Sequence, residues 1–165
     1  MGTDIRVGTQ ADVRGLVRMH AACSPASVEQ RYLSPMPVLA SRLAANLLCP
    51  PGGFSLVAER EHSIVAVTTV APDDDDDAGA AEVGQLVSDA YQRQGIGTAL
   101  LVAAAREAYR RGFTALRLAV SPGNRAVLPM VNAAGLRARI STSAGLTRVE
   151  IPLIRASRAS AVHSA

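Results

Sequence analysis

Apolar and polar residues alternate along the chain in short blocks that predict strands and amphipathic helices. The predicted strands, which are rich in Val, Ile and Thr, cover residues 5–7, 54–59, 63–70, 81–88, 114–120, 137–142 and 147–153. The predicted helices cover residues 9–22, 27–33, 38–48, 95–111 and 124–134. This series of elements predicts an α/β fold in which helices cover both faces of a mixed sheet.

Capping and helix-breaking residues mark the ends of several predicted helices. Thr9 is a suitable N-cap because Asp12 follows it three residues later, as in a capping box. Gly112 ends the long helix and Gly135 ends the short one, since glycine favours the left-handed conformation found at helix C-termini. Pro129 has no amide donor, so it must either kink the short helix or lie in its first turn.

Length and composition favour one soluble domain. The chain has 165 residues, of which 48% are apolar and 19% are charged, enough for one hydrophobic core but not for two ordinary domains. We expect this domain to cover residues 4–154, and a disordered tail without periodic apolar residues to cover 155–165. Because no apolar run could cross a membrane and no secretory signal begins the chain, we expect a cytoplasmic location and no membrane partner.

The formal charge of +3 conceals an uneven distribution. Five of the 14 acidic residues form one block at 73–77, which we expect to be a solvated loop or hairpin turn. The rest of the chain has 17 basic and 9 acidic residues, a net charge of +8. Such a basic body suits nucleic acid or a polyanionic cofactor. An aromatic content of 3% and the lack of a DNA-binding signature favour the cofactor and predict no nucleic-acid partner.

The cysteines and histidines do not form a recognisable metal site or disulfide framework. Cys23 and Cys49 are too few for such a framework and are expected to be buried as small hydrophobic residues. The three histidines are scattered along the sequence, so we expect no metal.

The segment "VSDAYQRQGIGTALL" combines a strand end, a polar turn and an immediate helix start. Gly95 and Gly97 let a ligand approach the backbone closely. The amides of the first helical turn have no partner within the helix, and the helix dipole adds positive charge. With Arg93 beside it, this turn is suited to a pyrophosphate. A third dinucleotide-motif glycine and a Walker lysine are both missing, and the glycine pair alone fits a ligand-free turn equally well.

Several motifs resemble the GNAT superfamily of N-acetyltransferases. "QRQGIG" at 92–97 is similar to the family's Q/R-x-x-G-x-G/A signature, and "IRVGTQADVRGLVRMH" at 5–20 resembles its opening strand and helix. Asn124, followed by Gly135 and Leu136, resembles the second cofactor motif. The resemblance covers roughly residues 4–153 and implies a single-domain GNAT fold. Its sheet would have six or seven mostly antiparallel strands with splayed central strands, and acetyl-CoA would be the cosubstrate, without a metal.

The resemblance also implies which residues contact the cofactor. Leu86 and Val87 would face the pantetheine and the acetyl carbonyl, and the Val87 amide could stabilise an oxyanion. Asn124 would contact the cofactor from the far side of the cleft. The pyrophosphate would be held by Gln92, Arg93, Gln94, Gly95, Ile96, Gly97 and Thr98.

Acetyl transfer needs a neutral amine, whereas a lysine amine has an ordinary pKa near 10.4, so a base must take its proton. Glu82 is our candidate base because it is the only carboxylate in the apolar run at 78–88. Strand alternation puts Glu82, Gly84 and Leu86 on one face. A surface glutamate without a catalytic role is the alternative. The departing thiolate, with a pKa of about 8.5, needs little or no acid.

Three segments are similar to the bacterial Pat-type protein lysine acetyltransferases, whose catalytic glutamate has the position of Glu82. These segments are "AEVGQLVSDAYQRQGIGTALL" at 81–101, "SPASVEQRYLSP" at 24–35 and "NRAVLPMVNAAGL" at 124–136. Val131 replaces the tyrosine that acts as a general acid in many GNAT enzymes.

Three functions stay open at this point. The first is acetylation of protein lysines with Glu82 as the base. The second is acetylation of a small amine in an acidic pocket, to which Asp89 and Glu29 could contribute. The third is a non-catalytic acyl-CoA-binding module. Either a monomer or a homodimer is compatible with the sequence.

Overall fold

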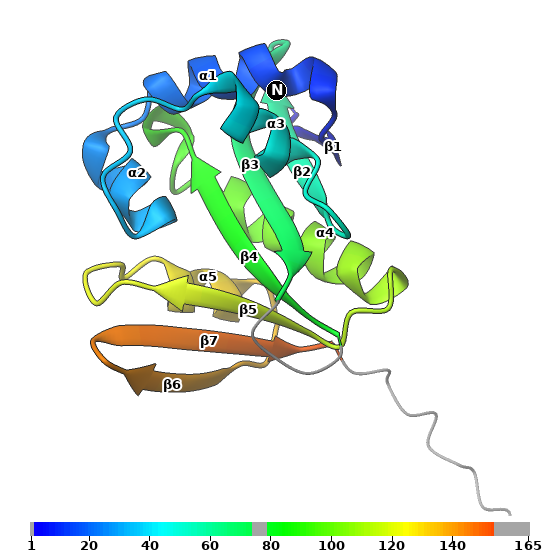
Figure 1. The fold of residues 1–165 in the computed structure, drawn as a ribbon. Helices are drawn as coiled ribbons and strands as arrows, with labels where there is room; N and C mark the ends of the chain where they lie inside the picture. The colour runs from blue at the N-terminus through cyan, green and yellow to red at the C-terminus, as the bar shows by residue number, and fades with distance from the viewer. Residues whose placement is uncertain (1, 74–78, 154–165) are drawn as a thin grey trace, which may run out of the picture.

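Seven strands form one sheet in the computed structural model, which describes residues 2–73 and 79–153 (Figure 1). The strands lie in the order β1-β2-β3-β4-β5-β7-β6. Strands β4 and β5 pair in parallel, whereas the other described neighbours pair antiparallel. Their bounds are β1 Asp4–Val7, β2 Phe54–Arg60, β3 Ser63–Pro72, β4 Ala80–Val87, β5 Ala115–Val120, β6 Arg139–Ser143 and β7 Leu146–Pro152. The predicted mixed, mostly antiparallel sheet is therefore confirmed.

Helices cover both faces of this sheet, as the sequence predicts (Figure 1). Helices α1 (Val13–Ala21), α2 (Pro25–Tyr32) and α3 (Ser41–Leu48) lie on one face, and α4 (Ile96–Arg110) and α5 (Val127–Ala133) lie on the other. Each face has its own apolar cluster, one built around Leu16 and Leu48 and the other around Leu100 and Leu116. Two short 3₁₀ turns, η1 (Gln10–Asp12) and η2 (Asp89–Tyr91), precede α1 and α4.

The helix ends follow local capping chemistry more closely than apolar periodicity. Helix α2 begins two residues earlier than predicted, because the Ser24 hydroxyl accepts a hydrogen bond from the Ser27 amide and Pro25 fits the first helical position. Gly112 and Gly135 have the expected left-handed φ of 90° and 68°. Of the two predicted positions for Pro129, a kink within the helix or a place in its first turn, the structure shows the first turn of α5.

Two predicted helices are longer than the observed ones. The prediction of a helix from 38 is wrong, since α3 begins at Ser41 and Leu39 is buried from an irregular segment. The prediction of a helix from 124 is also wrong, because Asn124 forms a turn in which its Oδ1 accepts from the Ala126 amide at 3.1 Å. Leu39 thus packs in the core, and Asn124 makes a hydrogen bond, although neither residue is part of the helix that follows it.

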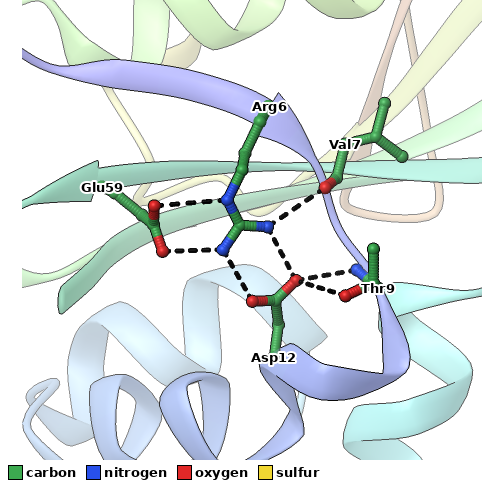
Figure 2. A network of polar contacts seen from close by, with 5 residues as sticks. All are labelled: Arg6, Val7, Thr9, Asp12 and Glu59. Carbon is green, nitrogen blue, oxygen red and sulfur yellow. Dashed lines mark hydrogen bonds and ion pairs between the residues drawn. The ribbon is translucent and has the colours of Figure 1, made fainter. Parts of the chain in front are cut away.

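An ion network joins the N-terminal strand to the start of the first helix (Figure 2). The Arg6 guanidinium donates to both Asp12 carboxylate oxygens at 2.7 and 2.8 Å and to Glu59 Oε1 at 2.7 Å. Asp12 Oδ2 also accepts from the Thr9 amide at 2.8 Å, and both bonds of the predicted capping box are present. The hydrogen bonds from Arg6 lower the pKa of Asp12 to about 2 despite its burial.

Two sequence predictions concern residues that the structure does not describe. The acidic block at 73–77 lies outside the described residues except for Asp73, whose Oδ2 accepts from Arg117 Nη1 at 2.8 Å. The predicted tail at 155–165 also lies outside them. The prediction that both cysteines are buried is wrong for Cys49, which is exposed because the chain turns away after the end of α3, and Cys23 is half-buried.

Within residues 2–73 and 79–153, no helix combines the length and the apolar character needed to span a membrane. The same part of the chain contains no group of three or more His, Cys, Asp or Glu side chains arranged to hold a metal ion.

Candidate functional site

The sheet splits between its two central strands. Strands β4 and β5 pair only at their beginnings, where Ala80 to Glu82 face Ala115 to Arg117, and they then diverge (Figure 1). Beyond Glu82, β4 keeps its pairing with β3 on its other edge. The inner edge of β4 is therefore left without a neighbouring strand from Val83 onward.

The backbone of β4 points alternately toward β3 and into this split. The Asp73 amide donates to the Ala80 carbonyl, and the Ser88 amide donates to the Val65 carbonyl, which makes the even-numbered positions of β4 the ones bonded to β3. The odd-numbered positions carry backbone groups that point toward β5. In the divergent part these are Val83, Gln85 and Val87.

A cavity of about 540 Å³ lies in the split. Its walls come from β4 at 83–87, the end of β5, helix α2, the loop and first turn of α4, and the segment 124–133. It thus passes between the strands, from the side covered by α2 to the side covered by α4 and α5. A cavity of this size and position can receive an elongated ligand that pairs with the inner edge of β4.

The loop before α4 has the geometry from which the sequence predicts an anion cradle. Gly95 is the N-cap of α4 with φ 80°, and no atom lies within 4 Å of where a Cβ would be. A Cβ added to Gly97 would lie 2.7 Å from Gln85 Nε2 and 3.2 Å from Met130 Sδ, so this glycine faces the cavity wall. Since α4 is 15 residues long, its dipole and its first free amides provide a positive site at this end of the cavity.

The structure brings most of the predicted cofactor-binding residues to this cavity. The predicted residues that line it are Leu86, Val87, Gln92, Arg93, Gly95, Gly97, Thr98 and Asn124. Gln92 Nε2 donates to the Val87 carbonyl and to Ser27 Oγ, both at 3.0 Å, and so ties the loop to β4 and α2. Leu86 contributes its buried side chain, because its backbone groups point to β3.

The side chains of two predicted residues point elsewhere. Gln94 Oε1 accepts from Arg60 Nη1 at 2.8 Å, and its amide nitrogen donates to the Ala90 carbonyl. Ile96 is 3% exposed and packs in the core beneath α4. Neither residue lines the cavity, so Ile96 can contribute only its backbone amide and Gln94 has no side-chain route to a ligand there.

The family model of the acetyltransferase (GNAT) family matches residues 16–135. The chain belongs to this family. Its fold is that of an N-acetyltransferase, with the split sheet and the cradle at the start of α4 as described above. A search of curated proteins gives no match.

Solved structures of other acetyltransferases share this fold. The GNAT domain of Streptomyces lividans PAT is 26% identical, with a TM-score of 0.81, over 91% of this chain and 90% of that one. YncA, an acetyltransferase from Salmonella typhimurium solved with acetyl-CoA, is 17% identical with a TM-score of 0.70 over 100% of both chains. PaiA from Thermoplasma acidophilum, solved with coenzyme A, is 16% identical with a TM-score of 0.69, over 91% of this chain and 98% of that one.

In this acetyltransferase Glu82 lies at the closed end of the split. It is the last β4 residue paired with β5, it faces Arg117, and it is exposed. It shares the α2 face of the sheet with Gly84 and Leu86, as the alternation predicts. Glu82 does not line the cavity, although Val83 beside it does. Glu82 is therefore the β4 residue that directly precedes the cavity lining, and it is exposed to water.

Helix α2 contributes residues to the site that the sequence analysis did not identify. Ser27, Gln30 and Arg31 line the cavity from the side opposite α4. The signal for them in the sequence is the resemblance of 24–35 to a segment of the Pat-type enzymes, which does not by itself indicate a role for these residues. The Arg31 guanidinium lies against Gly84, where an added Cβ would overlap it. This contact explains why a strand residue beside the cavity is glycine.

Asp89 fixes α2 to the cofactor loop and is not a free carboxylate in the cavity. It accepts hydrogen bonds from the Ser24 amide, the Ser24 hydroxyl and the Ser27 hydroxyl, each at 2.8 Å. Burial opposes ionisation of Asp89, but the hydrogen bonds from Ser24 and Ser27 outweigh it and hold its pKa below the ordinary value. Glu29 lines a separate depression of about 300 Å³ between α2 and the β6–β7 hairpin.

The charged lining of the main cavity is entirely basic. Arg93 lies in the loop before α4, Arg125 lies between β5 and α5, and Arg31 lies on α2, whereas no described carboxylate lines this cavity. Val131, at the position of the family's tyrosine, is 1% exposed and belongs to the core. The site therefore suits an anionic cosubstrate and lacks an acidic pocket for a cationic amine.

Proposed function

We propose that this protein transfers the acetyl group of acetyl-CoA to the side-chain amine of a lysine in a protein substrate, with Glu82 as the general base. The observation that carries the proposal is the arrangement of the split between β4 and β5. An anion cradle stands beside the split at the start of α4, and a solvent-exposed carboxylate lies at its closed end.

The residues around the cavity fit acetyl-CoA. The free amides at the start of α4, with Arg93 and Arg125, suit the pyrophosphate, because amide donors and full positive charges both favour phosphate oxygens. The backbone groups of Val83 and Gln85 that point into the split suit the amide groups of the pantetheine. Acetyl-CoA would supply an acetyl group already activated as a thioester.

The carboxylate of Glu82 would accept the proton of the lysine amine. Because Glu82 is exposed and next to the cavity rather than in its wall, this transfer would pass directly or through one water molecule. The Val87 amide, which points into the split, would donate to the oxygen that becomes negative during attack. A thiolate with an ordinary pKa near 8.5 can leave without an acid, which is consistent with Val131 in the core.

A protein acceptor has more support than a small cationic amine. Three segments of the sequence resemble the Pat-type protein lysine acetyltransferases, and the GNAT domain of Streptomyces lividans PAT is 26% identical over 91% of this chain. The small-amine hypothesis needs an acidic pocket, but Asp89 is bonded to Ser24 and Ser27, and Glu29 lies in the separate depression. Because Glu82 is exposed, a lysine side chain can reach its carboxylate while the rest of the acceptor protein stays outside the cavity.

The proposal is tested by measuring acetyl-CoA consumption with a panel of lysine-bearing proteins and a panel of small amines. Wild type should act on proteins, and Glu82→Gln should lose roughly 10²- to 10⁴-fold in kcat, the usual contribution of a general base. Glu61→Gln, which changes an exposed carboxylate in the β2–β3 turn, serves as the matched control and should keep full turnover.

The other outcomes separate the alternatives. Turnover of small amines alone would establish the small-amine acetyltransferase. Tight acetyl-CoA binding without turnover on either panel would favour a regulatory module. Full activity of Glu82→Gln at neutral pH would exclude Glu82 as the base.

A further inference from the structure

Arg31 reaches across the α2 face of the sheet and ends at the cavity. Its guanidinium rests on the backbone of Gly84, and its residue is part of the cavity wall. Gly84 lies between Glu82 and Leu86 on the same face of β4. The guanidinium is thus between the proposed base and the part of β4 at which the acetyl group is expected.

The positive charge of Arg31 has no hydrogen-bonded or ion-paired carboxylate within the described part of the chain, and Glu82 acts on it only through space. Its Nε is fully buried without a hydrogen-bond partner, and its Cζ lies 4.9 Å from the centre of the Tyr32 ring. No ion pair or hydrogen bond joins it to another side chain in residues 2–73 and 79–153. By contrast, Arg6 and Arg117 each contact two carboxylates. Burial lowers the pKa of Arg31 below its ordinary value, although Tyr32 and Glu82 oppose this effect.

A buried charge without a hydrogen bond or ion pair is unfavourable, so the place of Arg31 beside a cavity suggests that a bound ligand supplies the contacting anion. Of the other two arginines that line the cavity, Arg93 lies in the loop before α4 and Arg125 in the segment between β5 and α5. Arg31 lies on the opposite wall, on α2. Its anion is therefore expected where the amine and the acetyl group meet.

We propose that Arg31 is a catalytic residue that stabilises the negative charge formed during acetyl transfer. This inference rests on the proposed function. The amine nitrogen forms a bond to the carbonyl carbon, and the π electron pair moves to the acetyl oxygen. The electron pair on oxygen then re-forms the carbonyl as the carbon–sulfur bond breaks and its electron pair leaves on sulfur, and the amine proton passes to Glu82. Arg31 donates hydrogen bonds to the charged oxygen or sulfur and stays protonated throughout.

Two features favour this role over structural support for α2. The guanidinium makes no hydrogen bond that would fix α2 to another element in the described residues, whereas Asp89 makes three with α2 and the residue before it. In addition, Val131 in the core replaces the tyrosine acid of other family members, and a fixed cation beside the cavity can favour the developing negative charge without donating a proton.

The test measures kcat for the acceptor identified with the two panels, together with acetyl-CoA affinity. Arg31→Gln should lower kcat by roughly 10²- to 10³-fold, as removal of one oxyanion donor does, with an unchanged Kd for acetyl-CoA. Arg31→Lys keeps the charge without the planar donor pair, so its kcat should lie between those of wild type and Arg31→Gln. Exposed Arg14 on α1 provides the control, and Arg14→Gln should behave as wild type.

Chemical rescue separates catalysis from folding. Added methylguanidinium should restore kcat of Arg31→Ala at least ~10-fold, because the removed side chain leaves space beside Gly84. Methylguanidinium should not change the kcat of Arg14→Ala. A kcat of Arg31→Gln within threefold of wild type would overturn the inference, as would a loss confined to acceptors that carry a carboxylate. A wild type inactive on every acceptor would instead refute the proposed function and this inference with it.

Discussion

Replacement of Gly97 by alanine should separate cofactor binding from folding. Gly97 is in the first turn of α4 with an ordinary helical backbone, so alanine is conformationally acceptable there. The added methyl would lie 2.7 Å from Gln85 Nε2, which must move. Gln85 Oε1 accepts a hydrogen bond from Thr68 Oγ1 at 2.9 Å, and this bond would weaken as the amide shifts.

The effects on stability nearly cancel, whereas the effect on affinity does not. Alanine in place of glycine favours a helix by about 1 kcal/mol, and loss of one neutral hydrogen bond costs about 1 kcal/mol. The melting temperature should therefore change by no more than about 4 °C. A methyl in the cradle that prevents one amide–phosphate hydrogen bond costs roughly 1.5–3 kcal/mol, a roughly 10- to 150-fold weaker Kd.

Calorimetric titration with acetyl-CoA and thermal unfolding measure the two quantities on the same samples. Gly112→Ala is the matched control, since Gly112 lies at the other end of α4 with φ 90° and open space around it. That variant should lose about 1 kcal/mol of stability through backbone strain and bind acetyl-CoA normally. If Gly97→Ala is folded and binds acetyl-CoA with the wild-type Kd, the cradle assignment is refuted.

The remaining predictions concern stability. Asp12→Asn should lose about 2 kcal/mol at pH 7, because the Asp12 pKa of about 2 lies below its ordinary value of 3.8; this contribution is present above pH 4 and lost as the pH falls toward 2. Urea unfolding from pH 7 to pH 2 checks this, and equal pH dependence in wild type and variant would contradict it. His20 is 2% exposed, and burial lowers its pKa below 6.5, so wild-type stability should fall as the pH drops below about 6.5. His20→Phe should remove this slope between pH 7 and pH 5, and an unchanged slope would assign it to other groups.

Local sequence chemistry predicts much of the fold. The Thr9–Asp12 capping box, the left-handed Gly112 and the first-turn Pro129 each depend on residues within four positions, and all are confirmed. The start of α2 was also readable, because Ser24 before Pro25 is an N-cap followed by a first-turn proline. Apolar periodicity predicts too early a start for α3, because Val38 and Leu39 continue the apolar pattern without being helical.

The candidate site is less predictable than the fold because it depends on contacts between distant segments. Arg31 meets Gly84 across 53 positions, and no local pattern indicates this pair. Within the cofactor motif, the sequence gives the order of residues but not the direction of their side chains. The left-handed backbone at Arg93 and Gly95 turns Gln94 toward Arg60 and puts Ile96 into the core.

The carboxylate of Glu82 illustrates the same limit. Strand alternation correctly puts it on the face of Gly84 and Leu86. The sequence cannot show that β4 is still paired with β5 at this residue, or that the cavity begins at the next one. The residue at which β4 and β5 separate depends on tertiary packing, which the local sequence does not reveal.

A crystal structure of the protein with acetyl-CoA and a lysine peptide tests the central claim most directly. We predict phosphate oxygens within hydrogen-bond distance of the first amides of α4 and the sulfur between β4 and β5. The Glu82 carboxylate should reach the lysine nitrogen directly or through one water molecule. A sulfur outside this split, or a lysine nitrogen without such a path to Glu82, would contradict the account.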